Sequence, residues 1–168
     1  MGLIEPKKNM DIESSYNFRR ITEKLTTSGI VRPDALRALG SKGYEVLVNL
    51  LPDTSEYAIA NEREIVESQG IEYIHIPVDF KQPAASDFGK FSEALDRIHE
   101  RKVHVHCAAN YRVSAFYSLY AVSRGLWTAD QGMEFIHSIW QPSEHPGWSE
   151  FVAGVLAEVG AQQSSRAF

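Results

Sequence analysis

The sequence contains a single cysteine, Cys107, among its 168 residues. One cysteine cannot form a disulfide within the chain, which excludes a disulfide-stabilised secreted domain. No stretch approaches about 18 consecutive apolar residues, so the sequence predicts no membrane-spanning helix and no membrane partner. Residues 1–10 lack the apolar core of a signal peptide. A cytoplasmic protein is therefore the expectation from the sequence.

Basic residues are also fewer than acidic ones. The chain has 17 Lys and Arg residues against 22 Asp and Glu residues, a formal net charge of −5 at pH 7. A general nucleic-acid-binding protein normally carries a basic excess or stripe, so we expect no nucleic-acid partner. The acidic balance does not exclude a small anionic ligand, because a phosphate site needs only a local positive field. With 43% hydrophobic and 23% charged residues, extended disorder is excluded as well.

Internal repeats and low-complexity linkers are absent, which predicts one domain over residues 16–160. Residues 1–15 and 161–168 are mostly polar or small, and we expect these ends to be loosely ordered.

Short β-branched runs bounded by Gly and Pro predict buried strands, and they alternate with segments of helical periodicity. The predicted strands cover residues 44–50, 71–78 and 103–106, after a hairpin at 18–28. The predicted helices cover residues 33–39, 58–69, 86–98, 113–122, 128–140 and 151–159. This alternation predicts an α/β fold with a mostly parallel central sheet flanked by helices, and with a helical C-terminal third.

The most informative segment surrounds Cys107, which ends a predicted strand just before a loop of small and polar residues and a buried helix. This geometry directs several backbone N–H groups, and the positive end of the helix dipole, at one point. Arg112 follows five residues after the cysteine and is suited to bind an anion there. Such surroundings favour the thiolate form of a cysteine, so the segment predicts a nucleophile.

Two runs around this segment, YIHIPVDFKQP and VHVHCAANYRVSAF, resemble the cysteine-dependent protein tyrosine phosphatases, specifically the small dual-specificity-like bacterial members. The runs FRRITEKLTTSG and GYEVLVNLLP are similar to the opening hairpin and second strand of that group, so the resemblance covers most of residues 18–125. It implies an α/β phosphatase fold with a phosphate-binding loop after the His-Cys pair. It also implies that no metal or other cofactor is needed.

The resemblance implies a role for each residue of the loop. Cys107 would attack phosphorus and form a phosphocysteine intermediate. The backbone N–H groups that would hold the phosphoryl oxygens, together with the guanidinium of Arg112, belong to Ala108, Ala109, Asn110, Tyr111, Arg112 and Val113.

Three further residues would support the reaction. Ser114 would donate a hydrogen bond to the sulfur, and His106 would hold the loop. Asp79 would protonate the departing oxygen and later activate water, with Asp87 as the alternative acid. The implied partner is a phosphorylated protein or a small phosphate ester.

The loop departs from the family pattern, which has five residues between Cys and Arg, a Gly third after the Cys, and Ser or Thr after the Arg. Here four residues separate Cys107 from Arg112, and Val113 stands where the family has Arg. Asn110 replaces the glycine, and asparagine tolerates a left-handed backbone better than other residues. One helical residue corresponds to about 100° of rotation, so the direction of Arg112 is in question. Two alternatives follow, a catalytically weak phosphate- or phosphoprotein-binding module and a rhodanese-type sulfurtransferase.

We expect no metal site at the remaining candidate residues, and structural roles for them. His104 and His106 lie on one face of a strand beside Cys107, but no third ligand has a matching spacing, so no metal site is predicted. The charges of residues 62–64 are expected to be solvated, and the interval from Trp140 to Trp148 is expected to be a turn between packed helices.

Overall fold

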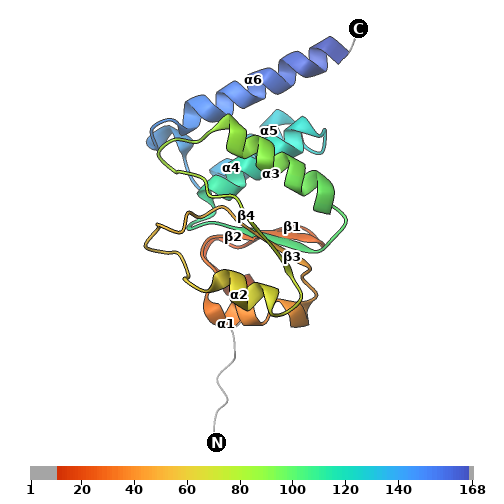
Figure 1. Ribbon diagram of the computed structural model, residues 1–168. Helices are drawn as coiled ribbons and strands as arrows, with labels where there is room; N and C mark the ends of the chain where they lie inside the picture. The colour runs from red at the N-terminus through yellow and green to blue at the C-terminus, as the bar shows by residue number, and fades with distance from the viewer. Residues whose placement is uncertain (1–10, 167–168) are drawn as a thin grey trace, which may run out of the picture.

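The computed structural model describes residues 11–166, and a five-stranded sheet lies at its centre (Figure 1). The strand order is β1-β2-β5-β3-β4, with β1 antiparallel to β2 and every other pair parallel. The strands are β1 (Arg19–Thr22), β2 (Leu25–Ser28), β3 (Val46–Asn49), β4 (Glu72–His75) and β5 (Val103–His106). The predicted mostly parallel sheet and the opening hairpin are both confirmed.

The central strands β3 and β5 are buried along their whole length, as expected for parallel strands that are covered on both faces. The register places the last residue of β5, His106, opposite Ser28 of β2 and Asn49 of β3, and Asn49 opposite His75 of β4. The carboxyl ends of the parallel strands therefore meet at one edge of the sheet. Ligands of open α/β sheets bind at this edge, and Cys107 follows His106 there.

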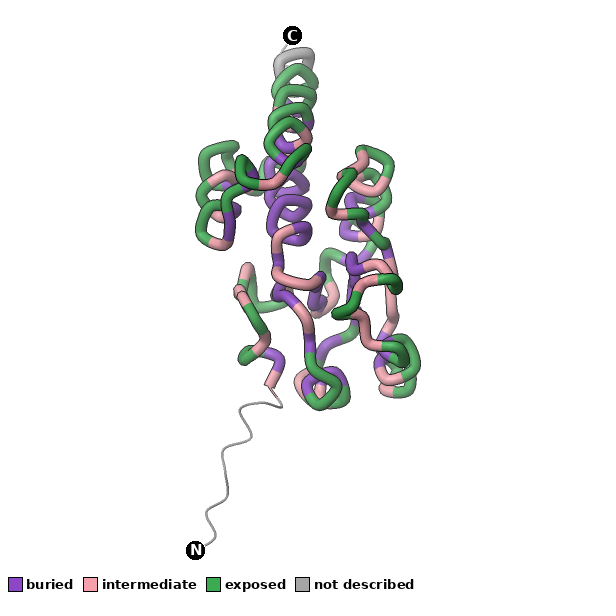
Figure 2. Tube along the Cα trace, turned by 90° about the vertical axis from the view of Figure 1, so that its left-hand side faces the viewer, coloured by how far each residue is buried: buried purple, intermediate pink, exposed green. Residues whose placement is uncertain are grey.

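Helices cover both faces of the sheet (Figure 1). One face carries α1 (Pro33–Arg37) and α2 (Glu62–Glu67), and the other carries α3 (Ala85–Ile98), α4 (Tyr111–Ser123), α5 (Ala129–His137) and α6 (Trp148–Arg166). Each layer has its own hydrophobic cluster. Figure 2 shows a run of buried residues through the centre of the molecule, where α4 is buried from Arg112 to Val122. The predicted central helix is confirmed. Among the described helices, none is both long and apolar enough to cross a membrane.

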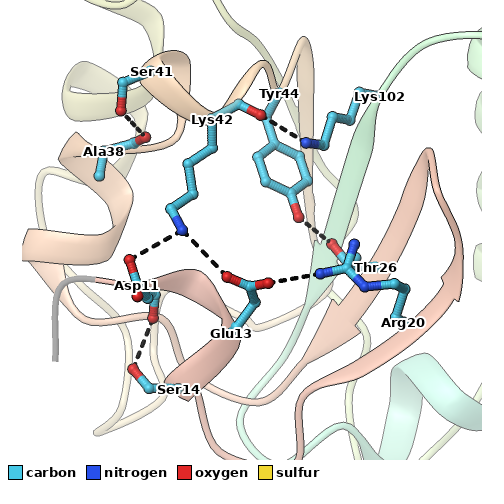
Figure 3. A network of polar contacts seen from close by, with 10 residues as sticks. All are labelled: Asp11, Glu13, Ser14, Arg20, Thr26, Ala38, Ser41, Lys42, Tyr44 and Lys102. Carbon is cyan, nitrogen blue, oxygen red and sulfur yellow. Dashed lines mark hydrogen bonds and ion pairs between the residues drawn. The ribbon is translucent and has the colours of Figure 1, made fainter. Parts of the chain in front are cut away.

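The ends of the described chain are more ordered than the sequence suggested. Residues 11–15 contain a short 3-10 helix, η2 (Ile12–Ser14), whose Ile12 side chain is buried. The Lys42 ammonium lies 3.0 Å from Asp11 and 3.2 Å from Glu13, and Glu13 also pairs with Arg20 at 2.7 Å (Figure 3). At the other end, α6 continues to Arg166 instead of stopping near residue 159. Residues 1–10 and 167–168, the remainder of the predicted loose ends, lie outside the described residues.

Two helix starts illustrate how local signals succeed or fail. The capping box of α5 is present, with Thr128 accepting from the backbone N–H of Gln131 and the Gln131 side chain accepting from that of Thr128. The helix predicted over residues 86–98 begins one residue earlier, at Ala85, and the preceding Ala84 makes no side-chain cap. The predicted helix over residues 58–69 is reduced to α2, since residues 58–59 are irregular and residues 60–61 and 68–69 form turns.

Candidate active site

The loop between β5 and α4 begins at Cys107, and α4 begins at Tyr111, so the predicted strand–loop–helix arrangement is confirmed. The loop lies against the end of β2. The Cys107 N–H donates to the Ser28 carbonyl at 3.3 Å, and the Ile30 N–H donates to the Ala108 carbonyl at 2.9 Å. Between these two contacts Gly29 forms an isolated antiparallel bridge to Ala109.

Gly29 allows this close approach because it has no side chain. A Cβ atom at this position would lie 2.4 Å from the Ala108 carbonyl oxygen and 2.9 Å from the Ala109 Cα, and both are backbone atoms of the loop. We predict that Gly29→Ala lowers the free energy of unfolding by about 1–3 kcal/mol through overpacking, measured by urea denaturation. The control is Gly89→Ala in α3, where a Cβ would meet nothing within 4 Å and helix propensity should raise stability. Equal behaviour of the two variants would contradict the prediction.

The backbone N–H groups of the loop are the main chemical feature of the site. From Ala108 to Val113, none of these N–H groups donates to an acceptor in the described part of the chain. The first intrahelical bond of α4 is made one residue later, by Ser114 to the Asn110 carbonyl at 2.9 Å. Nearly all buried N–H groups in proteins are paired, so a consecutive unpaired row at a helix start is typical of an anion-binding site.

Asn110 shapes this row of donors. It adopts the left-handed conformation, with φ of 68°, as predicted for the residue that replaces the family's glycine. Its amide nitrogen donates to the Asn17 carbonyl at 2.8 Å and to the Thr27 hydroxyl at 3.0 Å. Asn17 returns a bond to the Ala109 carbonyl at 3.0 Å. The loop is therefore held in its curved conformation by β2 and by the segment that precedes β1.

Arg112 is buried against the segment that follows β4. Its side chain is only 8% exposed, and Nη1 donates to the Val78 carbonyl at 3.0 Å. The guanidinium carbon lies 5.4 Å from the centre of the Phe80 ring. Its Nε is buried and has no partner among the described residues. Val113, at the position of the family's arginine, is fully buried in the core, so the positive charge of this loop comes from Arg112.

An aromatic cluster covers this side of the loop. The Tyr111 and Trp140 rings stack at 4.7 Å, and the Phe80 ring lies 5.9 Å from Trp140 and 5.3 Å from His145. The indole N–H of Trp148 donates to the Phe80 carbonyl at 2.8 Å. These contacts fix the segment after β4 against the starts of α4 and α6. Trp140 and Trp148 thus pack beside the loop, in addition to bordering the predicted turn.

The two candidate acids lie on and after this fixed segment. Asp79 is exposed, and its Oδ1 accepts from the Lys81 N–H at 2.9 Å. Its Oδ2 has no partner among the described residues. Asp87 lies in the first turn of α3, farther along the chain. The Arg112 bond to Val78 holds the residue directly before Asp79.

The sulfur of Cys107 is deeply placed. Cys107 is fully buried, and its thiol makes no hydrogen bond within the described residues. The Ser114 hydroxyl donates to the Tyr111 carbonyl at 3.0 Å and accepts from the Trp140 indole at 2.9 Å. In this arrangement Ser114 does not contact the sulfur, so its predicted role requires the hydroxyl to turn.

His106 forms a buried ion pair with a residue that the sequence did not single out. Its Nδ1 lies 3.1 Å from the Cys107 carbonyl and its Nε2 lies 2.7 Å from a Glu62 carboxylate oxygen. Because a carbonyl and a carboxylate only accept, both ring nitrogens must donate, as in an imidazolium. The same carboxylate oxygen accepts from the Tyr73 hydroxyl at 3.1 Å, which in turn accepts from the Asn49 amide. A positive charge is therefore held beside Cys107.

The pKa shifts of the pair agree with this assignment. Burial alone would raise the pKa of Glu62, but the charge of His106 and the bonds from His106 and Tyr73 outweigh it and lower that pKa. Burial alone would lower the pKa of His106, but the Glu62 charge and hydrogen bond outweigh it and raise that pKa. His104, by contrast, is neutral. Its burial and the nearby charge of His106 hold its pKa well below 6.5.

His104 is satisfied within the sheet. The Ser28 hydroxyl donates to the Gly29 carbonyl at 2.7 Å, so it accepts from Nε2 of His104 at 2.8 Å. Nδ1 then accepts from the Thr26 hydroxyl at 2.7 Å. Residues 11–166 contain no group of three or more His, Cys, Asp or Glu side chains arranged to hold a metal ion.

The ion pair predicts a pH-dependent stability. The lowered pKa of Glu62 contributes stability that is present above about pH 4.5 and is lost as the pH falls through the folded value. The raised pKa of His106 contributes stability that is full below about pH 6.5 and is lost as the pH rises through the folded value. Both contributions are therefore complete only between these two pH values.

We predict that Glu62→Gln, which keeps an acceptor but removes the charge, lowers the free energy of unfolding by about 2 kcal/mol in that window. The difference from wild type should shrink as the pH falls through the folded pKa of Glu62 and as it rises through that of His106. Urea denaturation across this pH range measures it. Glu64→Gln, an exposed change on the same helix, should have an effect below about 0.5 kcal/mol throughout. A difference that does not vary with pH would refute the ion pair.

Glu62 is the main residue that sequence reasoning missed, since its charge was expected to be solvated. It is only 4% exposed. One signal was present: Glu62 lies four residues before Val66, which places both on one helix face, and Val66 is fully buried. Nothing in the spacing indicated His106 as its partner.

Comparisons with known proteins find a matching family and similar solved structures. The family model of the beta-lactamase hydrolase-like protein, phosphatase-like domain, matches residues 17–126. A DUF442 protein from Shewanella putrefaciens CN-32, assigned as a phosphatase, is 31% identical to this chain. The match covers 94% of this chain and 98% of that chain, with a TM-score of 0.78. Among curated proteins, none matches the chain significantly.

More distant structures are similar in fold. TpbA from P. aeruginosa is 16% identical, with 91% of this chain and 92% of that chain covered and a TM-score of 0.70. The catalytic core of SIW14 from S. cerevisiae, a PP-IP phosphatase, is 12% identical, with 83% and 85% covered and a TM-score of 0.65. The predicted phosphatase-type α/β fold is confirmed by these matches.

Proposed function

The chain belongs to the family of phosphatase-like domains of beta-lactamase hydrolase-like proteins, within the cysteine-dependent protein tyrosine phosphatase-like superfamily. From this premise we propose that it hydrolyses phosphate monoesters with Cys107 as nucleophile. The observation that carries the proposal is the row of unpaired N–H groups from Ala108 to Val113, beside the unpartnered Nε of Arg112. Three equatorial phosphoryl oxygens require several donors at once, and preorganised donors of this kind stabilise the charge that develops in the transition state.

The reaction takes two steps. In the first, the Cys107 thiolate attacks phosphorus, an S–P bond forms and the bond to the departing oxygen breaks. Asp79 transfers its proton to that oxygen. In the second, Asp79 accepts a proton from water as the water attacks phosphorus, the S–P bond breaks and inorganic phosphate leaves. The thiolate is regenerated, and His106 holds the loop through its bonds to the Cys107 carbonyl and to Glu62. The mechanism requires no cofactor.

The substrate is a phosphorylated protein or a small phosphate ester. A variant of TpbA was solved in complex with phosphotyrosine, and SIW14 is a PP-IP phosphatase, which supports a phosphate ester as the substrate. TpbA in that complex is 14% identical to this chain, and the match covers 86% of this chain with a TM-score of 0.65.

A second function, a phosphate-binding module without turnover, is favoured by one observation: Cys107 is fully buried. Such a protein would keep the N–H row and bind phosphate without exposing the sulfur to phosphorus. The sulfurtransferase alternative has no comparable support, because the family match and the solved relatives described above are of the phosphatase type.

Hydrolysis of p-nitrophenyl phosphate between pH 5 and pH 8 tests the proposal. We expect release of p-nitrophenol that inorganic phosphate inhibits competitively. Phosphate binding by titration calorimetry with no release of p-nitrophenol would identify the binding module instead. Transfer of sulfur from thiosulfate to cyanide, in the absence of phosphate binding, would overturn both.

A further inference from the structure

A groove of about 400 Å³ begins at the phosphate-binding loop and is not used by the chemistry described above. Its lining residues come from the segment before β1, the segment after β2, the segment after β3 and the loop itself. They are Ser14, Ser15, Tyr16, Ile30, Arg32, Tyr57, Ala108 and Ala109. We call it the tyrosine groove. Its volume lies within the range of about 300–1,000 Å³ that is usual for small-molecule sites.

Two exposed aromatic rings distinguish this groove from the rest of the surface. Tyr16 is 60% exposed and Tyr57 is 52% exposed. Among the described residues, Leu126 is the third large hydrophobic side chain with comparable exposure, and it lies elsewhere. Exposed tyrosines offer an apolar face and a hydroxyl group to a ligand at low entropic cost.

The walls of the tyrosine groove are tied to the phosphate-binding loop. The Ile30 N–H donates to the Ala108 carbonyl at 2.9 Å, and the Gly29 N–H donates to the Tyr16 carbonyl at 2.7 Å. The segment before β1 is further held by the Lys42 pairs with Asp11 and Glu13 (Figure 3). A ligand whose phosphate lies on the loop would therefore meet preformed walls beside it.

The charge of the groove is positive. Arg32 is exposed, and its guanidinium has no ion pair or hydrogen bond within residues 11–166. No acidic side chain lines the groove, although the chain has 22 Asp and Glu residues. The cavity of about 470 Å³ beside α2 differs, because three carboxylates (Asp53, Glu62 and Glu64) line it together with Arg63 and His75. Of these two cavities, the tyrosine groove is the one suited to an anion.

We propose that the tyrosine groove binds the part of the substrate beyond the scissile phosphate, and that Arg32 binds a second anionic group there, a carboxylate or a second phosphate. This inference rests on the proposed function and narrows its substrates to phosphate monoesters that carry a further negative charge. A guanidinium forms paired, charge-assisted hydrogen bonds with either group, while the two tyrosines pack against the carbon skeleton between the charges.

Binding to the Cys107→Ser protein tests the inference without requiring turnover. Titration calorimetry compares phenyl phosphate with the 3- and 4-carboxyphenyl phosphates and with hydroquinone bisphosphate. We expect the doubly anionic esters to bind roughly three- to tenfold more tightly than phenyl phosphate at low salt, as for a partly exposed charge pair. The ester with the larger gain in affinity over phenyl phosphate, a carboxylate or the bisphosphate, identifies which second anionic group the groove prefers.

The variant Arg32→Ala, added to the same protein, should remove this preference and leave the affinity for phenyl phosphate unchanged within about twofold. Arg37→Ala is the matched control. Arg37 is also exposed and lies on α1, just after Arg32, but it pairs with Asp34 at 3.5 Å. The preference should also decline as salt is raised.

The outcomes separate this inference from the proposed function. If all the esters bind with one affinity, or if Arg32→Ala keeps the preference, the inference is overturned while the phosphate site stands. If no ester binds, both the inference and the proposed function are overturned. Turnover of p-nitrophenyl phosphate by the Arg32→Ala variant, with Cys107 intact, shows that the loop itself is undamaged.

Discussion

Replacing Cys107 by serine is expected to lower kcat for p-nitrophenyl phosphate by about 10⁴-fold or more, while the affinity for inorganic phosphate is retained. The serine hydroxyl is not ionised at neutral pH and is a poor nucleophile without an adjacent base. The row of N–H groups from Ala108 to Val113 belongs to the backbone and is unaffected by the substitution. Initial rates and titration calorimetry with phosphate measure the two quantities separately.

An independent measurement supports the same step. In wild-type protein quenched during turnover, mass spectrometry should find one phosphoryl group on the peptide that contains Cys107. The Cys107→Ser protein should show none, and its retained affinity for phosphate shows that it is folded. Turnover that survives the substitution would refute Cys107 as the nucleophile and point to another group in the site.

Arg112→Lys is expected to lower kcat/KM by about 10²–10³-fold, the usual cost of losing one preorganised donor to a developing charge. Lysine keeps the positive charge but lacks the planar fork. The wild-type guanidinium uses Nη1 on the Val78 carbonyl and keeps Nε free for a ligand, and an ammonium cannot reproduce both positions. Steady-state kinetics with p-nitrophenyl phosphate measure the loss.

The control for this variant is Arg124→Lys at the other end of α4, where the guanidinium pairs with Asp96 at 2.7 Å on the surface. It should leave kcat/KM unchanged within about twofold, since exposed pairs contribute little. Unchanged activity of Arg112→Lys would show that the N–H row binds the phosphoryl group without the arginine. The guanidinium of Arg112 would then have no specific role in the reaction.

The local parts of the site could be predicted from the sequence. Short β-branched runs, helical periodicity and Gly or Pro boundaries predicted the alternating fold, and β5 was placed at 103–106 as observed. The left-handed conformation of Asn110 also followed from the chain itself, because it depends on the backbone preferences of one residue. These features are set by neighbours within a few positions along the chain.

The contacts that tune the site could not be predicted in this way. Glu62 and His106 are 44 residues apart, and nothing in either local pattern indicated that α2 would bury a carboxylate against the end of β5. The N–H of Trp148 reaches Phe80 across 68 residues. The spacing left the direction of Arg112 open, and its bond to the Val78 carbonyl across 34 residues decides it.

The sequence by itself determined the strand–cysteine–loop–helix segment, the row of residues that supplies the N–H groups and the position of the proposed nucleophile. Only the tertiary structure decided which side chains surround them: the Glu62 carboxylate at His106, the Val78 carbonyl at Arg112 and the free Arg32 in the tyrosine groove. The physical reason is that backbone conformation follows from local sterics and hydrogen bonding. The partner of a side chain, in contrast, depends on how distant segments pack, and that packing is set by the burial of the whole chain.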